Sequence, residues 1–562
     1  MKPGCLPFWA RRLRLGLALA LSSSVPALAG PAVGSIALPP DLAAWDAPSF
    51  LVASLELAGA HTLPEVEKRR LKAAYEGRML TLAEAQALRD EVAAFYAEAG
   101  YLQAQVTIPD QRLGAGRFRL QIDEGTLARI EVTSDGRLDP AYVQARLERR
   151  LTGPLRLETL QEALLGAQED QQVARLDASL RPGGRPGEAV LAVAVEEAQP
   201  WALGLSVDNH RPESIGAESG RINLSHQNVT GQGDQLALSI AHSEGSDAGA
   251  LHYRRPLNAA DATLAVFWSR DEAQVLEAPF SALAIESQTD RYGLQLQAPL
   301  RERLRSRLST SLAFERRVTV TKLLGERFSL SPGAVDGEAG VNAASLALDY
   351  VYRGEAQVLA LRGTLRRGLR GRGTTRAAPG ALVEADGTFL LALLQGQFQY
   401  RLAPHWTLTA RGLAQFSRDP LLAAEKLSLG GASTVRGYRE NLLVRDNGVG
   451  LNVELAYAPF QTGDRSRLYG LSLVAFLDGG AAWDEGNVTP NSTVKDTTRR
   501  AEILGGGLGL HWEMPQGLTL KAFWGKDLAD NFAPGEDPRE GSSNPGLQNQ
   551  GVHLQLSYLR RF

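Results

Sequence analysis

The last eleven residues of the chain, 552–562, alternate strictly between apolar and polar side chains. The apolar face of this run carries Val552, Leu554, Leu556 and Tyr558. The run ends on the aromatic residue Phe562. A strand of about ten residues with one apolar and one polar face is the unit of a transmembrane β-barrel. The ending therefore predicts a bacterial outer-membrane barrel, and the remainder of the chain tests this prediction.

The same alternation recurs from Trp201 onward. Apolar residues occupy every second position in six clear runs, which contain Leu203 and Leu205, Leu236 and Leu238, Leu264 and Val266, Leu312 and Phe314, Leu346 and Leu348, and Leu451 and Val453. Dividing residues 199–562 by about 22 residues per strand and connection predicts about 16 antiparallel strands. Long polar segments at 322–342, 419–449 and 525–551 are predicted to be extracellular loops.

The N-terminus has the pattern of a secretory signal. A basic stretch is followed by a short apolar run and then by Ala27-Leu28-Ala29, so residues 1–29 are expected to be removed. The single cysteine, Cys5, lies inside this segment, which excludes disulfides, thiol nucleophiles and zinc ribbons from the mature chain. The net charge of −3 gives no sign of a nucleic-acid partner.

Residues 50–198 contain one unit of about 70 residues in two copies, 50–125 and 126–198. Each copy reads strand, helix, helix, strand, strand. In the first copy, Thr62-Leu63-Pro64-Glu65 and Thr81-Leu82-Ala83-Glu84 both predict capping boxes at helix starts. Two interpretations remain open for these small α+β domains: spacers, or open sheet edges that accept an extended peptide by strand addition.

Enzyme signatures are absent from the sequence. It contains no nucleophile elbow, zinc-protease motif, phosphate-binding loop or dinucleotide fingerprint. The eight histidines, among them His210 and His226, are scattered without metal-ligand spacing. The sequence therefore predicts no catalytic residue, metal or cofactor.

One segment, Leu429-Gly430-Gly431-Ala432-Ser433-Thr434-Val435-Arg436-Gly437-Tyr438, stands out among the loops. Its glycines allow an unusual backbone path that presents Arg436 at the tip. Alternation in the strand near 471–480 directs Phe476 and Asp478 into the lumen. A carboxylate there needs a partner or water, so either Arg436 pairs with Asp478 or both groups are solvated.

The chain resembles the two-partner-secretion transporters (TpsB), the hemolysin secretion/activation proteins of the POTRA-plus-barrel superfamily. The likeness rests on Val435-Arg436-Gly437-Tyr438, on residues 476–480 and on Phe562. Further matches are Leu57-Ala58-Gly59, Gly77-Arg78, Gly100-Tyr101, Pro109-Asp110-Gln111, Asp123-Glu124-Gly125, Val207-Asp208-Asn209, Asn228 and Gly231-Gln232-Gly233-Asp234. The resemblance covers almost the whole mature chain.

This resemblance implies a 16-stranded barrel at 199–562, preceded by POTRA domains at 50–125 and 126–198. It implies a loop near 428–445 that enters the lumen, with Arg436 paired to Asp478 and with Gly430, Gly431, Val435, Gly437 and Tyr438 shaping the loop. Tyr558 and Phe562 would form a C-terminal signal for the barrel-assembly machinery. Some members carry a plug helix before the first POTRA domain, but the prolines in the short linker 30–49 disfavour one here.

The implied function is export of an unfolded exoprotein of the large β-helical adhesin or cytolysin type, by a monomer in the outer-membrane lipid. A contact-inhibition toxin is equally open as the exported protein. The POTRA domains would lie in the periplasm. Two rivals remain open. One is an assembly factor that inserts other barrels, although such proteins are expected to carry more POTRA copies. The other is a passive porin with periplasmic appendages, and a hydrolase barrel is a more distant alternative.

Overall fold

The structure, a computed structural model, describes residues 49–562 except 186, 331–332, 372, 377–384, 461–467, 486–499 and 533–545. The predicted signal segment, nearly all of the linker 30–49 and the expectation about a plug helix lie outside the described residues. The chain divides after Ala198 into two compact units. None of the described helices is long and apolar enough to cross a membrane.

The first module of the N-terminal unit has a three-stranded sheet in the order β2-β5-β4 and a two-stranded sheet of β1 and β3. Its elements are β1 (Ser49–Val52), β2 (Ser54–Ala58), α1 (Glu65–Tyr75), β3 (Arg78–Thr81), α2 (Leu82–Glu98), β4 (Gln105–Thr107) and β5 (Arg117–Asp123). Buried Leu88, Tyr96 and Phe118 belong to the core between helices and sheet.

The two capping boxes predicted in this module have different outcomes. At α2 the prediction is confirmed, because Thr81 and Glu84 bond reciprocally through side chain and backbone. At α1 it is wrong, because the N-cap is Pro64, without a side-chain cap. The backbone N–H and hydroxyl of Thr62 instead donate to Glu124 Oε1 at 2.6 and 2.7 Å. The carboxylate of Glu124 therefore binds the backbone N–H and the hydroxyl of Thr62, both of which the predicted capping box would have used.

The second module repeats the three-stranded sheet and the two helices of the first, but its described residues contain no counterpart to the sheet of β1 and β3. Its elements are β6 (Thr126–Ser134), α3 (Pro140–Arg150), α4 (Leu157–Gln168), β7 (Val173–Pro182) and β8 (Glu188–Glu197). The sheet order is β6-β8-β7, with β6 parallel to β8 and β7 antiparallel to it, as β2 and β4 are to β5. The duplication seen in the sequence is therefore a duplication of fold.

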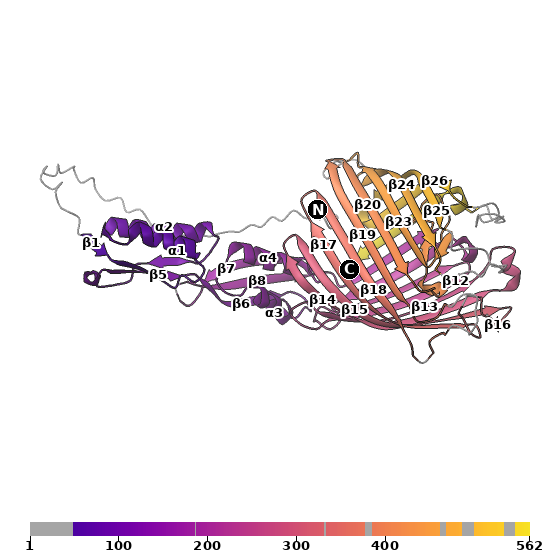
Figure 1. The fold of residues 1–562 in the computed structure, drawn as a ribbon, viewed down its shortest axis with the longest axis horizontal. Helices are drawn as coiled ribbons and strands as arrows, with labels where there is room; N and C mark the ends of the chain where they lie inside the picture. Colours follow the sequence, from indigo (N-terminus) through magenta and orange to yellow (C-terminus); the bar gives the residue numbers. More distant parts are fainter. Residues whose placement is uncertain are drawn as a thin grey trace. The chain divides into compact units, whose positions relative to one another are not determined.

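The second unit is a closed antiparallel barrel (Figure 1). Its described residues form sixteen long strands: β9 (Trp201–Asp208), β10 (Ser219–Gln227), β11 (Gln235–Ser243), β12 (Ser246–Pro256), β13 (Thr263–Gln274), β14 (Glu286–Arg303), β15 (Ser306–Leu323), β17 (Glu338–Arg353), β18 (Gln357–Leu369), β19 (Leu390–Ala403), β20 (Trp406–Ser417), β23 (Asn447–Tyr457), β24 (Leu471–Trp483), β25 (Ala501–Glu513), β26 (Leu518–Asp530) and β27 (Val552–Arg561). The two-residue β16 (Glu326–Arg327) pairs antiparallel with the last two residues of β15.

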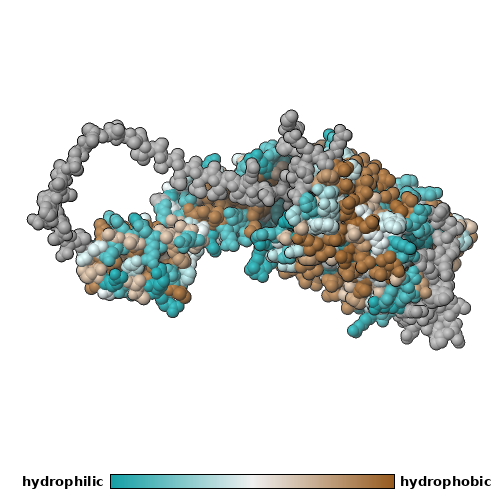
Figure 2. Space-filling model, turned by 90° about the horizontal axis from the view of Figure 1, so that it is seen from above, coloured by the Kyte–Doolittle hydropathy of each residue, from teal (hydrophilic) through white to brown (hydrophobic). Residues whose placement is uncertain are grey.

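The alternation of the sequence matches the two surfaces of the barrel. Apolar residues gather over its outer surface (Figure 2). The residues expected to face lipid are exposed: Leu236, Leu238, Ile240, Leu312, Phe314, Leu346, Leu348 and Leu451. Closure is made by β27 on β9, with Gln555 opposite Asp208 and Arg561 opposite Ala202. The backbone N–H and C=O groups along the edges of the first and last strands are thereby paired with each other. A sheet in a bilayer needs this pairing, because the hydrocarbon core has no water to bind such groups.

Candidate functional site: an arginine loop locked inside the barrel

The connection between β20 and β23, residues 418–446, forms a hairpin that we call the lumenal loop. Its short strands β21 (Leu427–Leu429) and β22 (Leu443–Arg445) pair with each other. Leu429, Val435 and Tyr438 are at most 1% exposed. They pack in one cluster with Ala482 of β24 and Ile503 of β25. An apolar loop buried against inward-facing wall residues is a loop folded into the lumen.

Arg436, at the tip of this loop, contacts Asp478 of β24. Its Nε lies 2.7 Å from Asp478 Oδ2 and its Nη2 lies 2.9 Å from Oδ1, while its backbone N–H donates to Oδ2 at 3.1 Å. This is the fork-on-fork geometry that makes arginine–carboxylate pairs directional. The structure brings together the two residues that the sequence singled out.

Three further wall residues complete the surroundings of Arg436. Its Nη1 donates to Glu454 Oε1 of β23 at 2.6 Å. Its Cζ lies 3.8 Å from the ring centroid of Phe476 and 4.8 Å from that of Phe523. Arg436 is 2% exposed and Asp478 0%. Removing one partner from such a buried pair typically costs about 3–5 kcal/mol, since the other charge stays buried.

Glycines on both sides let the loop tip approach the wall. Gly437 has a φ of +97°, and a Cβ there would lie 2.8 Å from the carbonyl carbon of Lys526 in β26. On the wall, a Cβ at Gly525 would lie 2.7 Å from the nitrogen of Gly437, and one at Gly505 would collide with the carbonyl oxygen of Arg436. The wall is thus shaped to accept the backbone of the tip.

The adjacent glycines Gly430 and Gly431 turn the chain directly after β21. Gly430 has a φ of +105° and Gly431 a φ of +100°. A side chain at Gly431 would collide with the carboxyl group of Glu440, whose Oε1 accepts the N–H of Ala432 at 2.6 Å. Burial, opposed by this hydrogen bond and reinforced by the charge of Asp208, raises the pKa of Glu440 to about 7.

The tip is also fastened to the start of the barrel. Glu440 N donates to Gln548 Oε1 at 3.0 Å. The amide nitrogen of Gln548 donates to the carbonyls of Asn209 and Arg211, just beyond β9. Tyr438 O–H lies 2.9 Å from the carbonyl of Ala529 and 3.2 Å from that of Leu504.

The C-terminal residues singled out by the sequence lie at the closure of the barrel. Phe562 N donates to Trp201 O at 3.0 Å, and Trp201 N donates to Phe562 O at 3.1 Å. Tyr558 stands opposite Leu205 in β9 and Leu518 in β26. Phe562 is 51% exposed.

Sequence reasoning missed Glu454, Phe523, Gly505 and Gly525. The first two could have been found by alternation, because Val453 and Trp524 beside them are outward candidates. The run Gly505-Gly506-Gly507 inside a strand signals close backbone approach. No group of three or more metal-ligand side chains occurs within the described ranges.

Residues 187–512 match the family of haemolysin secretion/activation proteins ShlB/FhaC/HecB, and residues 50–125 match the ShlB-type POTRA domain. The chain belongs to this haemolysin secretion/activation family. The resemblance to TpsB transporters and the predicted barrel fold are thereby confirmed. Membership and fold together place the protein in the outer membrane, with its POTRA region in the periplasm.

Among curated relatives, the chain is 22% identical to the outer membrane transporter CdiB of Dickeya dadantii (strain 3937) over 479 residues, which cover 83% of this chain and 81% of that protein. It is 26% identical to the hemolysin transporter protein ShlB of Serratia marcescens over 378 residues, 64% of each chain. The solved structure of CdiB from Escherichia coli superposes with a TM-score of 0.69 at 20% identity, covering 93% of each chain.

Proposed function

We propose that this protein exports one dedicated unfolded polypeptide through its barrel, gated by the lumenal loop. The observation that carries this proposal is the buried contact of Arg436 with Asp478 and Glu454. A passive porin needs an open lumen, whereas here the chain's own loop lies inside it. A loop held by reversible polar contacts suits a channel that opens for a specific cargo.

The periplasmic modules offer a means of capture. In the described residues, β7 pairs only with β8, so one edge of this ten-residue strand faces no other strand. An extended peptide can add to such an edge by main-chain hydrogen bonds, without demanding a particular sequence. This supports the recognition of an unfolded chain rather than a folded one.

The proposed cargo is a secreted exoprotein of the large β-helical adhesin or cytolysin type. One relative is named as a hemolysin transporter, which supports a cytolysin as the cargo. Folding of the exoprotein outside the cell would supply the driving force. Tyr558 and Phe562 are proposed to act earlier, as the signal by which the barrel-assembly machinery inserts this barrel as a monomer.

Replacement of Arg436 by Ala tests the role of the loop. We expect export of the cognate exoprotein to be abolished, because Asp478 and Glu454 lose their shared partner and the tip leaves its site. Barrel assembly, measured by heat-modifiable gel mobility, should be retained. Arg445→Ala is the matched control, since Arg445 belongs to the same loop but its Nε reaches Asp484 only at 3.5 Å. Normal secretion by well-assembled Arg436→Ala protein would refute the proposal.

A further inference from the structure

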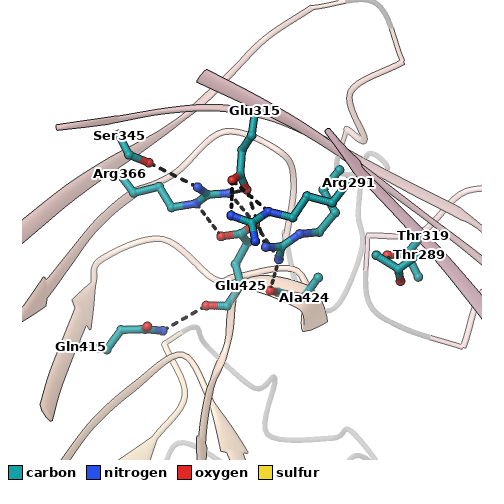
Figure 3. A network of polar contacts seen from close by, with 10 residues as sticks. Thr289, Arg291, Glu315, Thr319, Ser345, Arg366, Gln415, Ala424 and Glu425 are labelled. Atoms are coloured by element: carbon teal, nitrogen blue, oxygen red, sulfur yellow. Dashed lines mark hydrogen bonds and ion pairs between the residues drawn. The ribbon is translucent and has the colours of Figure 1, made fainter. Parts of the chain in front are cut away.

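A second charged network holds the beginning of the lumenal loop (Figure 3). Glu425 lies in the short helix η5 (Ala423–Glu425), just after β20. Arg366 of β18 donates two hydrogen bonds to the carboxylate of Glu425, from Nε to Oε2 at 2.8 Å and from Nη2 to Oε1 at 3.1 Å. Arg317 of β15 adds Nη1 at 3.2 Å from Oε1 and also donates to the carbonyl of Ala424.

The wall completes this network with a carboxylate of its own. Glu315 of β15 accepts from Arg291 of β14, at 2.6 Å from Nη2 and 3.0 Å from Nε, and also from Arg366. The side chains of Glu315 and Glu425 are each 4% exposed and that of Arg366 is 13% exposed. Three arginines therefore surround two buried carboxylates, one from the wall and one from the loop.

The two networks have opposite polarity and use different walls. At the tip the loop supplies the cation, Arg436, and the wall supplies carboxylates. At the base the loop supplies the carboxylate, Glu425, and the wall supplies arginines. The strands that hold the base, β14 to β18, are separated from β23 by β19 and β20. Each network also has its own apolar cluster, and the one at the base contains Leu421 and Leu422.

We propose that Glu425 is a positioning residue that anchors the base of the lumenal loop independently of the Arg436 contact at the tip. Residues 419–426 stay attached to β15 and β18 when the tip is released, so the loop pivots about its base instead of leaving the lumen as a whole. The meaning of this pivot for export rests on the proposed function; the anchoring itself does not.

Hydrogen–deuterium exchange on the purified full-length protein, without any cargo, tests this inference. In Glu425→Gln protein, exchange of residues 419–426 should accelerate at least about tenfold, because a buried ion pair loses one partner. Exchange of residues 432–438 should stay unchanged. Arg436→Ala should give the reverse pattern, and the double variant should show both changes. Acceleration of both segments by Arg436→Ala alone would overturn the inference, as would undiminished protection of residues 419–426 in Glu425→Gln protein.

Two controls make the outcome specific. Glu355→Gln removes a glutamate whose side chain is 85% exposed and which pairs with Arg305, so it should change neither segment. Glu315→Gln alters the same network but leaves Glu425 its arginine partners Arg366 and Arg317, so residues 419–426 should remain protected. Deprotection of the base by Glu315→Gln equal to that by Glu425→Gln would overturn the inference.

If Glu425→Gln fails to assemble, Arg366→Gln removes the opposite partner and should give the same local pattern; its failure to do so would count against the anchor. Because no cargo is present, the result is separate from export. Export by Arg436→Ala protein would refute the proposed function while leaving an observed base anchor intact.

Discussion

At the residue scale, Arg436 is held by several different contacts at once. Asp478 supplies a bidentate partner, Glu454 a second carboxylate, and Phe476 a ring face at 3.8 Å from the guanidinium. A lysine carries the same charge but cannot reproduce the planar fork. The arrangement therefore selects arginine by geometry as well as by charge.

Gly437→Ala should release the tip without removing any charge. The residue has a φ of +97° and its added methyl would meet the backbone of Lys526 at 2.8 Å. Strain of this kind typically costs about 1–3 kcal/mol. We expect faster hydrogen exchange at residues 432–438 and reduced export. Gly363→Ala on β18 is the control, because a methyl added there would meet no described atom within 4 Å beyond its chain neighbours; equal exchange in both variants would contradict the argument.

Docking of the tip should also depend on pH through Glu440. Burial raises its pKa to about 7 from an ordinary value of 4.5. The docked loop therefore favours the protonated acid, so docking is strongest below pH 4.5 and weakens as the pH rises to about 7. A spin label at Ser433→Cys should become more mobile across this range. Glu440→Gln should flatten the profile, and an unchanged slope in that variant would assign the effect to another group.

At the scale of elements, the sequence predicted a strand or helix correctly where the local pattern and the tertiary contacts favour the same structure. Alternation located the barrel strands because lumen and lipid impose a period of two on every strand. The capping box at Thr62 failed because Glu124, distant in sequence, accepts the backbone N–H that Glu65 was expected to accept, and the Thr62 hydroxyl also donates to Glu124. The segment 322–342, expected to be a loop, includes strand at both ends: β15 runs to Leu323 and β17 begins at Glu338.

In the candidate site, too, one part could be predicted from the sequence and another could not. Arg436 and Asp478 could be proposed from glycine content and alternation, and a family resemblance connected them. The network around Glu425 could not be predicted, because it joins residues on β14, β15 and β18 to a loop more than fifty residues later than Arg366. No local pattern encodes such a contact, which depends on the closure of the barrel.

The exposed edge of β7 gives a prediction of its own. Consecutive residues of a strand direct their N–H groups to opposite edges, and proline has no N–H to donate. One of the two variants Ala178→Pro and Ser179→Pro therefore removes an N–H on the free edge and should keep the pairing of β7 with β8. That variant, recognised by an unchanged melting transition, should bind a denatured cargo domain at least about tenfold more weakly, since strand addition relies on main-chain hydrogen bonds. Unchanged affinity would exclude this edge as the capture site.

At the scale of the whole molecule, the chain contains two units with different proposed roles. The N-terminal unit repeats a module with open sheet edges, and the barrel holds a loop anchored by two charged networks. At the barrel closure the lumen contains a cavity whose lining includes the polar side chains of Ser206, Asn223, Gln555 and Ser557. A polar channel wall suits the passage of an extended backbone.

The central claim, that the cargo passes through the lumen, is tested most directly by crosslinking an arrested export intermediate. A cognate exoprotein fused at its C-terminus to a tightly folded domain should stall in transit. A photocrosslinking residue at Ser557, which lines the cavity, should then capture the cargo, whereas one at the neighbouring Leu556, 43% exposed on the outer surface, should not. Equal capture from both positions, or none from Ser557 while export is stalled, would contradict the account.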